Sequence, residues 1–334
     1  MLEENNIHDR IISSKEHIHD LKDEDHIRPQ ILSDFVGQSD LVSNLKIFIQ
    51  AAQERKEALE HILFYGPPGV GKTTLSMIIA HEIGSNMHVT SGPIIERPAD
   101  LAALLTSLQP FDILFIDEIH RMRPNTEEIL YSAMEDGYFD IMLGKGTSAK
   151  AMRITLEPFT LVGATTKLSA LSSPLRDRFG STMKLGFYNE KEMHTIIKRS
   201  ARILNLNIED AAAIELGKRS RGTPRIGNRL LRRVRDFAQI EKQNMVDLTF
   251  VQYALSKLFV DSYGLDDNDK KLLTIIIDKF SGGPVGLTTL AAALSEEVDT
   301  IETVYEPFLL QMGFLERTSR GRKITDLGKR YIYK

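Results

Sequence analysis

The stretch FYGPPGVGKTTL at 64–75 constrains the fold more than any other feature of this 334-residue chain. It fits the phosphate-binding pattern G-x-x-x-x-G-K-[ST] through Gly66, Gly71, Lys72 and Thr73. The apolar HILFY that leads into it predicts a short buried strand, and the apolar spacing after it predicts a helix. Glycines let backbone N–H groups turn toward phosphate oxygens, and a helix N-terminus adds positive potential there. The stretch therefore predicts an α/β nucleotide-binding fold.

The residue types of this loop suggest a division of roles on ATP. We expect Lys72 to reach the terminal phosphates and the Thr73 hydroxyl to ligate Mg²⁺. Gly69, Gly71 and Thr74 complete the loop residues that we expect to bind the nucleotide.

Polar residues follow two further strand-like runs. FDILFIDEIH at 111–120 is an apolar run that ends in Asp117 and Glu118, and FTLVGATT ends in Thr165 and Thr166. Acids at the carboxyl ends of parallel strands lie where α/β sheets bind ligands. Asp117 is expected to hold Mg²⁺ and Glu118 to activate a water aimed at the γ-phosphate. The two threonine hydroxyls would hold that water or the γ-phosphate.

A pair of cations occurs in SPLRDRFG at 173–180. Arg176 and Arg178 are candidates for an arginine finger, which stabilises the charge that develops on a departing phosphate. The alternative is a surface pair between Arg176 and Asp177, which would contribute little.

Composition limits the other classes of function. The chain has no cysteine, which excludes disulfides, thiolate zinc sites and a cysteine nucleophile, and no apolar run is long enough to span a membrane. The polar N-terminus is not a signal peptide, so we expect a cytoplasmic protein. The net charge is −4, yet residues 217–242 hold nine Lys or Arg against two acids, and residues 311–334 hold seven against two. Such blocks indicate local anionic partners, or alternatively solvated basic helix faces.

A hairpin is predicted at 137–158, where two strand-like runs flank the turn GKGTSAK. Ile141, Leu143, Ile154 and Leu156 alternate along it, so one apolar face could meet a partner. The alternative is a hairpin packed on its own domain.

The last third of the chain is mainly helical in its periodicity, first as an all-α unit from about 189. Helices expected near 267–280, 287–295 and 299–311, followed by the ribbon GFLERTSRGRKITDLG, form the order of a winged helix. Arg317 and Arg322 in the ribbon are candidates for DNA phosphate contacts, with Arg320 and Lys323 nearby. The acidic helix DTIETVYEPFLLQM argues against base reading, and a winged helix used for protein contacts is the alternative.

The motifs GPPGVGKT, LFIDEIH, GATT, SPLRDRFG and RGTPRIGNRLLRRVRDFA, in this order, resemble the RuvB family of AAA+ ATPases. The resemblance runs from about Ile27 to the end. It implies an α/β P-loop domain with a parallel sheet and helices on both faces, then a small all-α lid and a C-terminal winged helix. The implied divisions are an N-terminal arm at 1–26, the ATPase domain at 27–185, the lid at 186–260 and the winged helix at 261–334.

The resemblance also assigns roles to individual residues. It makes Arg178 the finger that reaches a neighbouring subunit's nucleotide, Arg225 a sensor that touches ATP in the same subunit, and Thr166 the sensor of the central strand. The residues that it places around the adenine and ribose are Ile27, Arg28 and Tyr188.

The activity implied by the resemblance is branch migration of Holliday junctions, driven by ATP and Mg²⁺, in recombination, DNA repair and the SOS response. It implies homo-hexameric rings on duplex DNA of any sequence, a RuvA-like partner docked on the hairpin through its apolar side chains, and a possible junction resolvase. Two alternatives share the ATP site: a protein remodeller and an ATP-switched winged-helix regulator. A two-lobed DExH helicase, suggested by DEIH, needs a second lobe for which the chain has little room.

The N-terminal arm departs from the family pattern, since it is rich in acids and carries His8, His17, His19 and His26. No further ligands are spaced for a metal site, so a solvated arm is the simpler interpretation.

Overall fold

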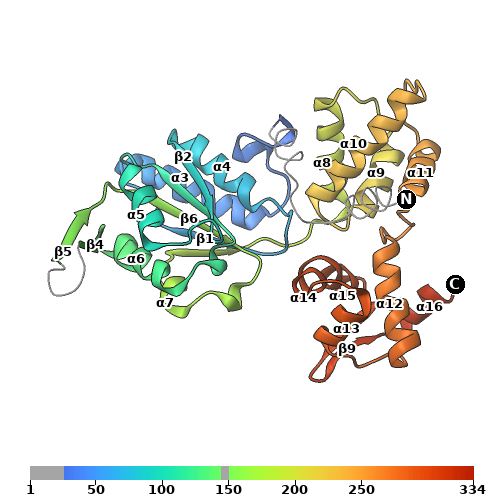
Figure 1. Ribbon diagram of the computed structural model, residues 1–334. Coiled ribbons are helices and arrows are strands. Elements are labelled where there is room, and N and C mark those ends of the chain that lie inside the picture. The colour runs from blue at the N-terminus through green and yellow to red at the C-terminus, as the bar shows by residue number, and fades with distance from the viewer. Residues whose placement is uncertain (1–25, 144–149) are drawn as a thin grey trace. The chain divides into compact units, whose positions relative to one another are not determined.

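The computed structural model describes residues 26–143 and 150–334, with side chains at 26–141 and 151–334 (Figure 1). The chain forms two compact units. The sheet unit comprises Arg28–Gly66 and Gly71–Gly186, and the helical unit comprises Pro67–Val70 and Phe187–Lys334 together with residues 26–27. In the described residues no helix is both long and apolar enough to cross a membrane.

The sheet unit is built on five parallel strands in the order β2-β3-β6-β1-β7. The three central strands are buried on both faces, as their apolar runs predict. The strands are β1 (Ile62–Tyr65), β2 (Met87–Ser91), β3 (Ile113–Asp117), β6 (Thr160–Thr165) and β7 (Ser181–Lys184). The predicted parallel sheet is confirmed.

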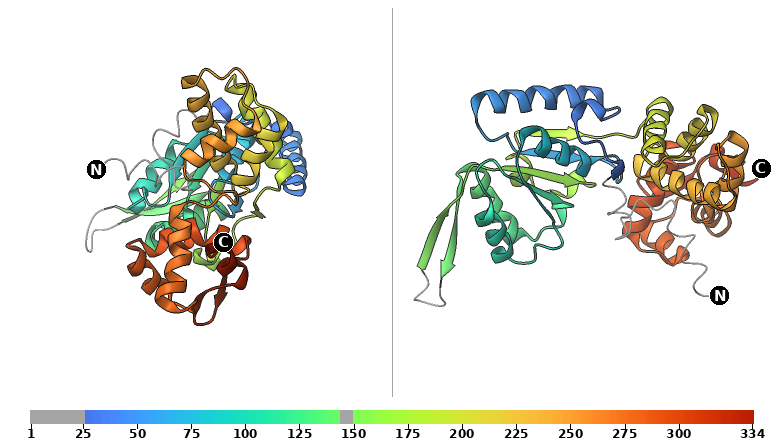
Figure 2. Two further views of the ribbon diagram at one scale, coloured as in Figure 1. Left: turned by 90° about the vertical axis from the view of Figure 1, so that its right-hand side faces the viewer. Right: turned by 90° about the horizontal axis from the view of Figure 1, so that it is seen from above.

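Helices cover both faces of the sheet, with α3 and α4 on one side and α5 and α6 on the other (Figure 2). Side chains of β3 alternate between the two layers. Leu114 and Ile116 join the core beneath α5 and α6, while Ile113 and Phe115 are buried on the opposite face. Each such fully buried side chain contributes about 1.5–3 kcal/mol. The helices are α3 (Ser39–Arg55), α4 (Lys72–Ile83), α5 (Pro98–Ser107) and α6 (Pro124–Glu135).

Smaller elements connect this framework. An antiparallel hairpin, β4 (Tyr138–Leu143) with β5 (Lys150–Thr155), projects from the sheet just after α6 (Figure 1). Phe139 opposes Ile154 at its base and is buried in the core beneath α6. The remaining elements are η1 (Leu32–Asp34), η2 (Ile119–Arg121), η4 (Leu168–Ala170) and α7 (Ser173–Arg176).

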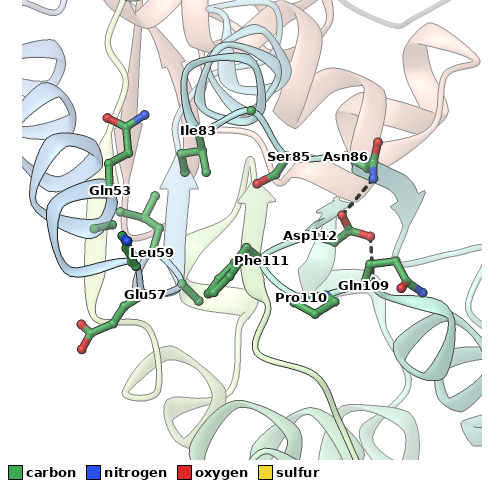
Figure 3. Close-up of a pocket in the computed structure, with 14 residues that line it drawn as sticks. Gln53, Glu57, Leu59, Ile83, Ser85, Asn86, Gln109, Pro110, Phe111 and Asp112 are labelled. Atoms are coloured by element: carbon green, nitrogen blue, oxygen red, sulfur yellow. Dashed lines mark hydrogen bonds between the residues drawn. The ribbon is translucent and has the colours of Figure 1, made fainter.

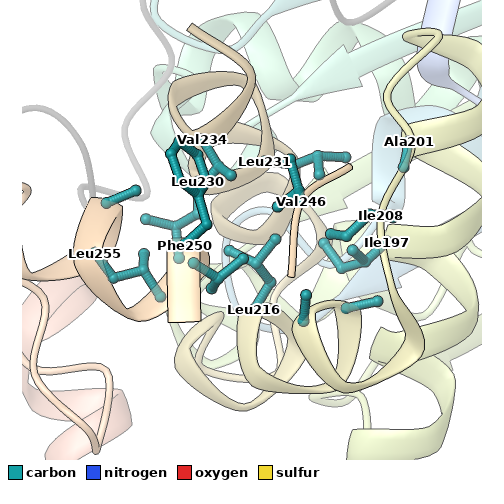
Figure 4. Close-up of a cluster of buried hydrophobic side chains, with 14 of the residues drawn as sticks. Ile197, Ala201, Ile208, Leu216, Leu230, Leu231, Val234, Val246, Phe250 and Leu255 are labelled. Carbon is teal, nitrogen blue, oxygen red and sulfur yellow. The ribbon is translucent and has the colours of Figure 1, made fainter. Parts of the chain in front are cut away.

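Four helices of the helical unit form the lid, and local signals mark their starts. Asn189 and Glu192 form a capping box at the first helix, Pro224 opens the third, and Asp247 caps the fourth. Their apolar faces meet in one core around Leu216, Leu230 and other buried aliphatic residues (Figure 4). The lid helices are α8 (Glu190–Ile203), α9 (Asp210–Arg219), α10 (Pro224–Ile240) and α11 (Leu248–Lys257).

A winged helix completes the helical unit, as predicted. Asp266 caps α12 (Asp267–Phe280), which is followed by α13 (Leu287–Leu294). The helix that begins at α14 continues through a π-helical turn into α15, and the ribbon β8–β9 is the wing. The later elements are α14 (Val298–Thr300), η5 (Ile301–Tyr305), α15 (Glu306–Gln311), β8 (Leu315–Thr318), β9 (Gly321–Ile324) and α16 (Asp326–Ile332).

Candidate nucleotide site

The phosphate-binding loop leaves β1 through a position that only glycine can occupy. Gly66 has a φ of +150°, and a Cβ there would lie 2.1 Å from the carbonyl oxygen of Leu185. Gly66 N–H donates to the Thr165 carbonyl at 3.2 Å, which joins the loop to the end of β6. Gly71, with a φ of 107°, is the N-cap of α4. The loop therefore ends at a helix N-terminus, the feature expected for phosphate binding.

Lys72 begins α4 and is 7% exposed. Its Nζ donates to the Gly66 carbonyl at 2.9 Å, so the ammonium lies against the loop. Thr73 and Thr74 occupy the same first turn and are half-buried. The structure thus brings together the loop residues predicted to bind phosphate.

The acidic pair lies at the carboxyl end of β3, beside the end of β6. Asp117 Oδ1 accepts from the Glu118 N–H at 2.8 Å. Glu118 has left-handed backbone with a φ of 45°, and its carboxylate accepts from the Thr166 hydroxyl at 3.1 Å. The predicted water-activating carboxylate and the predicted sensor are therefore in direct contact.

His120 is a contact that sequence reasoning missed. Its side chain is 9% exposed, and Nδ1 lies 3.2 Å from Glu118 Oε2. The same nitrogen lies 2.8 Å from the Thr165 hydroxyl, which also accepts from the Lys167 N–H at 3.0 Å. Thr165 is fully buried, so its hydroxyl serves these protein contacts rather than an open site. The histidine of DEIH was the available signal, but its direction depends on the turn η2.

The oxygen donors at the start of α4 and at the end of β3 fit a magnesium ion. Mg²⁺ prefers oxygen ligands and usually takes one or two from the protein, the others being phosphates and waters. The Thr73 hydroxyl and the Asp117 carboxylate supply such oxygens in the sheet unit. Within the described residues there is no cluster of three or more His, Cys, Asp or Glu that could hold a metal by itself.

The helical unit holds a second set of predicted nucleotide residues. Tyr188 is 5% exposed, and its hydroxyl donates to the Val70 carbonyl at 2.9 Å. Arg225 lies in the first turn of α10, where N–H groups lack helical acceptors, and its N–H donates to the Gly69 carbonyl at 3.4 Å. A Cβ at Gly69 would come within 2.8 Å of Thr223 Cγ2. The middle of the phosphate loop therefore packs against the start of α10.

The other two residues predicted around the adenine and ribose, Ile27 and Arg28, fall in different units. Ile27 is 2% exposed, and its carbonyl accepts a hydrogen bond from Arg199 in the helical unit. Arg28 belongs to the sheet unit, where Nη1 contacts Met77 Sδ at 3.4 Å.

The two candidate finger arginines have different surroundings. Arg176 lies 3.8 Å from its neighbour Asp177, with both side chains well exposed, as the surface-pair alternative described. Arg178 makes an ion pair with Glu135 at 2.8 Å and is only 29% exposed. Arg176 is therefore a solvated surface cation, whereas Arg178 is held in place by Glu135.

The hairpin residues divide between core and surface. Ile141, Ile154 and Leu156 pack partly against the core of their own domain, which is the alternative that the sequence left open. The side chain of Leu143 lies outside the described residues. Met152, opposite Ile141, is 48% exposed and extends the same apolar face outward.

The two predicted DNA-contacting arginines of the wing share one buried carboxylate. Arg317 donates to Glu306 through Nε and Nη2 at 2.8 and 2.9 Å, and Arg322 does so at 2.8 and 3.0 Å. Glu306 is 0% exposed. Sequence reasoning did not foresee this pairing.

A pocket of about 370 Å³ lies at the amino ends of the strands, away from the carboxyl ends that carry the acidic pair (Figure 3). Its lining includes Ser85, Asn86, Phe111 and Asp112, which directly precede β2 and β3. Asp112 accepts from Asn86 Nδ2 at 3.2 Å and from the Gln109 N–H at 2.9 Å. The phosphate loop follows the carboxyl end of β1, so this pocket is not the nucleotide site.

These features define the class of protein. The chain has the parts of an AAA+ ATPase with an appended winged helix. The P-loop follows the central strand β1, and the acidic pair ends β3, which β6 separates from β1. A four-helix lid and the winged helix follow. Family models match along the chain: Holliday junction DNA helicase RuvB P-loop domain over 27–185, RuvB AAA lid domain over 188–261 and RuvB C-terminal winged helix domain over 262–333. The chain belongs to the RuvB family.

Named relatives cover nearly the whole chain. The Holliday junction branch migration complex subunit RuvB of Dehalococcoides mccartyi (strain CBDB1) is 56% identical over 324 residues, which are 97% of this chain and 93% of that protein. The subunit of the same name from Lawsonia intracellularis (strain PHE/MN1-00) is 58% identical over 302 residues, 90% of this chain and 89% of that protein. The solved Thermotoga maritima RuvB Holliday junction branch migration motor is 48% identical, with a TM-score of 0.85, covering 92% of this chain and 98% of that chain.

Proposed function

We propose that this chain is an ATP-hydrolysing motor that moves duplex DNA of any sequence and so drives branch migration of Holliday junctions in recombination and DNA repair. The observation that carries the proposal is one chain with a complete P-loop site and a winged helix, similar over 97% of its length to a branch migration subunit. A homo-hexameric ring, a place in the cytoplasm and a role in the SOS response belong to the same proposal.

Hydrolysis in this proposal relies on groups that the sheet unit already orients. Lys72 binds the terminal phosphates from the first turn of α4, and Glu118, held by Thr166, takes the proton of the attacking water. The Thr73 hydroxyl and the Asp117 carboxylate would hold Mg²⁺, which neutralises phosphate charge when bound. The backbone around Gly66 and Gly71 turns N–H groups toward phosphate oxygens.

The remaining residues recognise the nucleotide and complete the site. Ile27, Arg28 and Tyr188 would contact the adenine and ribose, and Arg225 would touch ATP in the same subunit. Arg178 would reach the nucleotide of a neighbouring subunit and stabilise the charge on the departing phosphate, an effect worth about 10³–10⁵ in rate.

The proposed partners would bind at the wing and at the hairpin. Arg317 and Arg322 on the wing would contact DNA phosphates, which position a protein without reading sequence. The outer part of the hairpin, where the apolar face is exposed at Met152, would dock a RuvA-like partner together with Leu143. A junction resolvase is a possible further partner.

The test is steady-state ATP hydrolysis alone and with four-way junction DNA, linear duplex or an unfolded protein. We expect stimulation by DNA of any sequence and a loss of hydrolysis in Arg178→Ala. Mixing Arg178→Ala with Lys72→Ala subunits should recover hydrolysis, because intact sites then meet intact fingers. Stimulation by unfolded protein alone would favour a remodeller, and binding of one DNA sequence would favour a regulator. No recovery in co-assembled mixtures would refute the shared site.

A further inference from the structure

One face of α6 runs along the loop that carries Arg178. Glu127, Tyr131 and Glu135 are spaced by four residues, so their side chains lie above one another on the same side of the helix. Each of the three contacts α7 or the residues that flank it. The contact is therefore continuous over two turns of helix.

The first contact fixes where α7 begins. Glu127 is 8% exposed, and its Oε1 accepts from the Ser172 hydroxyl and, at 2.9 Å, from the Tyr131 hydroxyl. Ser172 is the N-cap of α7 and accepts from the Leu175 N–H at 3.3 Å. A buried carboxylate that accepts two hydroxyl hydrogen bonds is expensive to disturb, because loss of a donor leaves charge without a partner. The turn that carries Arg178 is therefore anchored to α6.

The second contact orients the guanidinium of Arg178. Its carbon lies 4.8 Å from the centre of the Tyr131 ring, within the range of a cation–π interaction. Nη1 donates to the Pro174 carbonyl at 2.8 Å, and Nη2 pairs with Glu135 at 2.8 Å. The ring, the carbonyl and the carboxylate hold the planar group from three sides.

The Tyr131 hydroxyl is protonated at neutral pH, as any ordinary tyrosine is, and donates to Glu127. Burial and the neighbouring Glu127 carboxylate raise the pKa of Tyr131, against a hydrogen bond with Ser172 that lowers it. The phenol therefore stays a hydrogen-bond donor to Glu127 well above neutral pH.

We propose that Glu127, Tyr131 and Glu135 form a bracket that positions Arg178 for the nucleotide of a neighbouring subunit. The inference rests on the proposed role of Arg178 as a finger. In the alternative, the same contacts only stabilise the fold, since Glu135 is 63% exposed and an exposed ion pair contributes little. The two interpretations make different predictions for ATP hydrolysis. A bracket that positions Arg178 affects hydrolysis only when it lies in the subunit that supplies the finger.

Mixed subunits separate the two interpretations. In rings of Arg178→Ala and Lys72→Ala subunits, the working sites belong to the first variant and the working fingers to the second. Tyr131→Leu in the Lys72→Ala subunit should lower the recovered hydrolysis roughly tenfold, because a displaced catalytic group loses rate steeply. Tyr131→Leu in the Arg178→Ala subunit should change it less than about twofold, because no finger remains there to position.

Graded variants and co-assembly complete the design. Tyr131→Phe in the Lys72→Ala subunit keeps the ring and should lose roughly threefold, between the parent mixture and Tyr131→Leu. If Tyr131→Leu subunits do not fold or co-assemble, Glu127→Gln provides the same comparison of placements. An equal loss in both placements, or a loss in neither, would overturn the bracket. A parent mixture that never recovers hydrolysis would instead refute the role of Arg178, and the bracket with it.

Discussion

Removal of Arg317 or Arg322 from the wing should destabilise the winged helix, whatever its effect on DNA binding. Glu306 is fully buried and is held by Arg317 and Arg322, whose side chains are 52% and 16% exposed. A buried carboxylate without its partners costs about 3–5 kcal/mol. Because Arg317 is half in solvent, we expect Arg317→Ala to cost at most about 1 kcal/mol and Arg322→Ala about 2 kcal/mol. The double variant should approach about 3–5 kcal/mol.

The pH dependence of the stability of the winged helix should change sign when both arginines are removed. Burial alone would raise the pKa of Glu306, but hydrogen bonds from Arg317 and Arg322 outweigh it and hold the pKa below its ordinary value. The carboxylate therefore stabilises the native state above pH about 4.3, and this stability is lost as the pH falls through the lower native pKa. Without both arginines only burial remains, so the pKa rises and the double variant becomes more stable as the pH falls.

Native-state hydrogen exchange in the full chain is the suitable assay, because a chain of several domains has no single unfolding free energy. Protection of amides in β8, β9 and α15 should fall in Arg322→Ala and recover in part when Glu306→Gln is added. Arg320→Ala is the matched control, since Arg320 is exposed at the turn and makes no ion pair in the described part of the chain. Full protection in Arg322→Ala, with only DNA binding lost, would refute the reasoning.

Three further predictions concern buried or catalytic carboxylates and their neighbours. Glu118→Gln should keep ATP affinity within a few-fold and lose hydrolysis by about 10²–10⁴, checked by nucleotide binding and turnover. His120→Ala should lower kcat roughly tenfold with little change in KM, and His120→Asn should restore part of it if a donor to Glu118 is what matters. Burial raises the pKa of Asp269 to about 7 even with Arg221 beside it, so stability from its protonated form is lost as the pH rises from about 4 through 7. Asp269→Asn should flatten this pH dependence in the hydrogen exchange of α12.

The central strands were predictable from sequence and the edge strands were not. β1, β3 and β6 are covered on both faces, and each therefore reads as an apolar run. β2 and β7 lie at the edges of the sheet, and none of their residues is fully buried. Sequences such as MHVTS and STMK carry too few apolar residues to stand out as strands.

The same limit applies to the site. The proximity of Asp117, Glu118 and Thr166 could be predicted because each ends or follows a recognisable strand, and the carboxyl ends of parallel strands lie together. Tyr131 and Glu135 are more than forty residues from Arg178, and nothing in their local sequence indicates that α6 and α7 are neighbours. Contacts between elements depend on packing, which a single sequence shows only through its patterns of burial.

In the winged helix, the charge of a residue was a poor guide to its role because its ion-pair partners could not be read from the sequence. The acidic composition of the helix DTIETVYEPFLLQM argues against base reading, yet its Glu306 points inward and holds two arginines of the wing. Two arginines on one carboxylate leave a net charge of +1, and each guanidinium has five N–H donors, of which only two are used here. Glu306 therefore orients the arginines without neutralising the wing. A phosphate could bind the remaining donors of a platform that is already ordered, which is why a structural role and a DNA role for Arg317 and Arg322 are compatible.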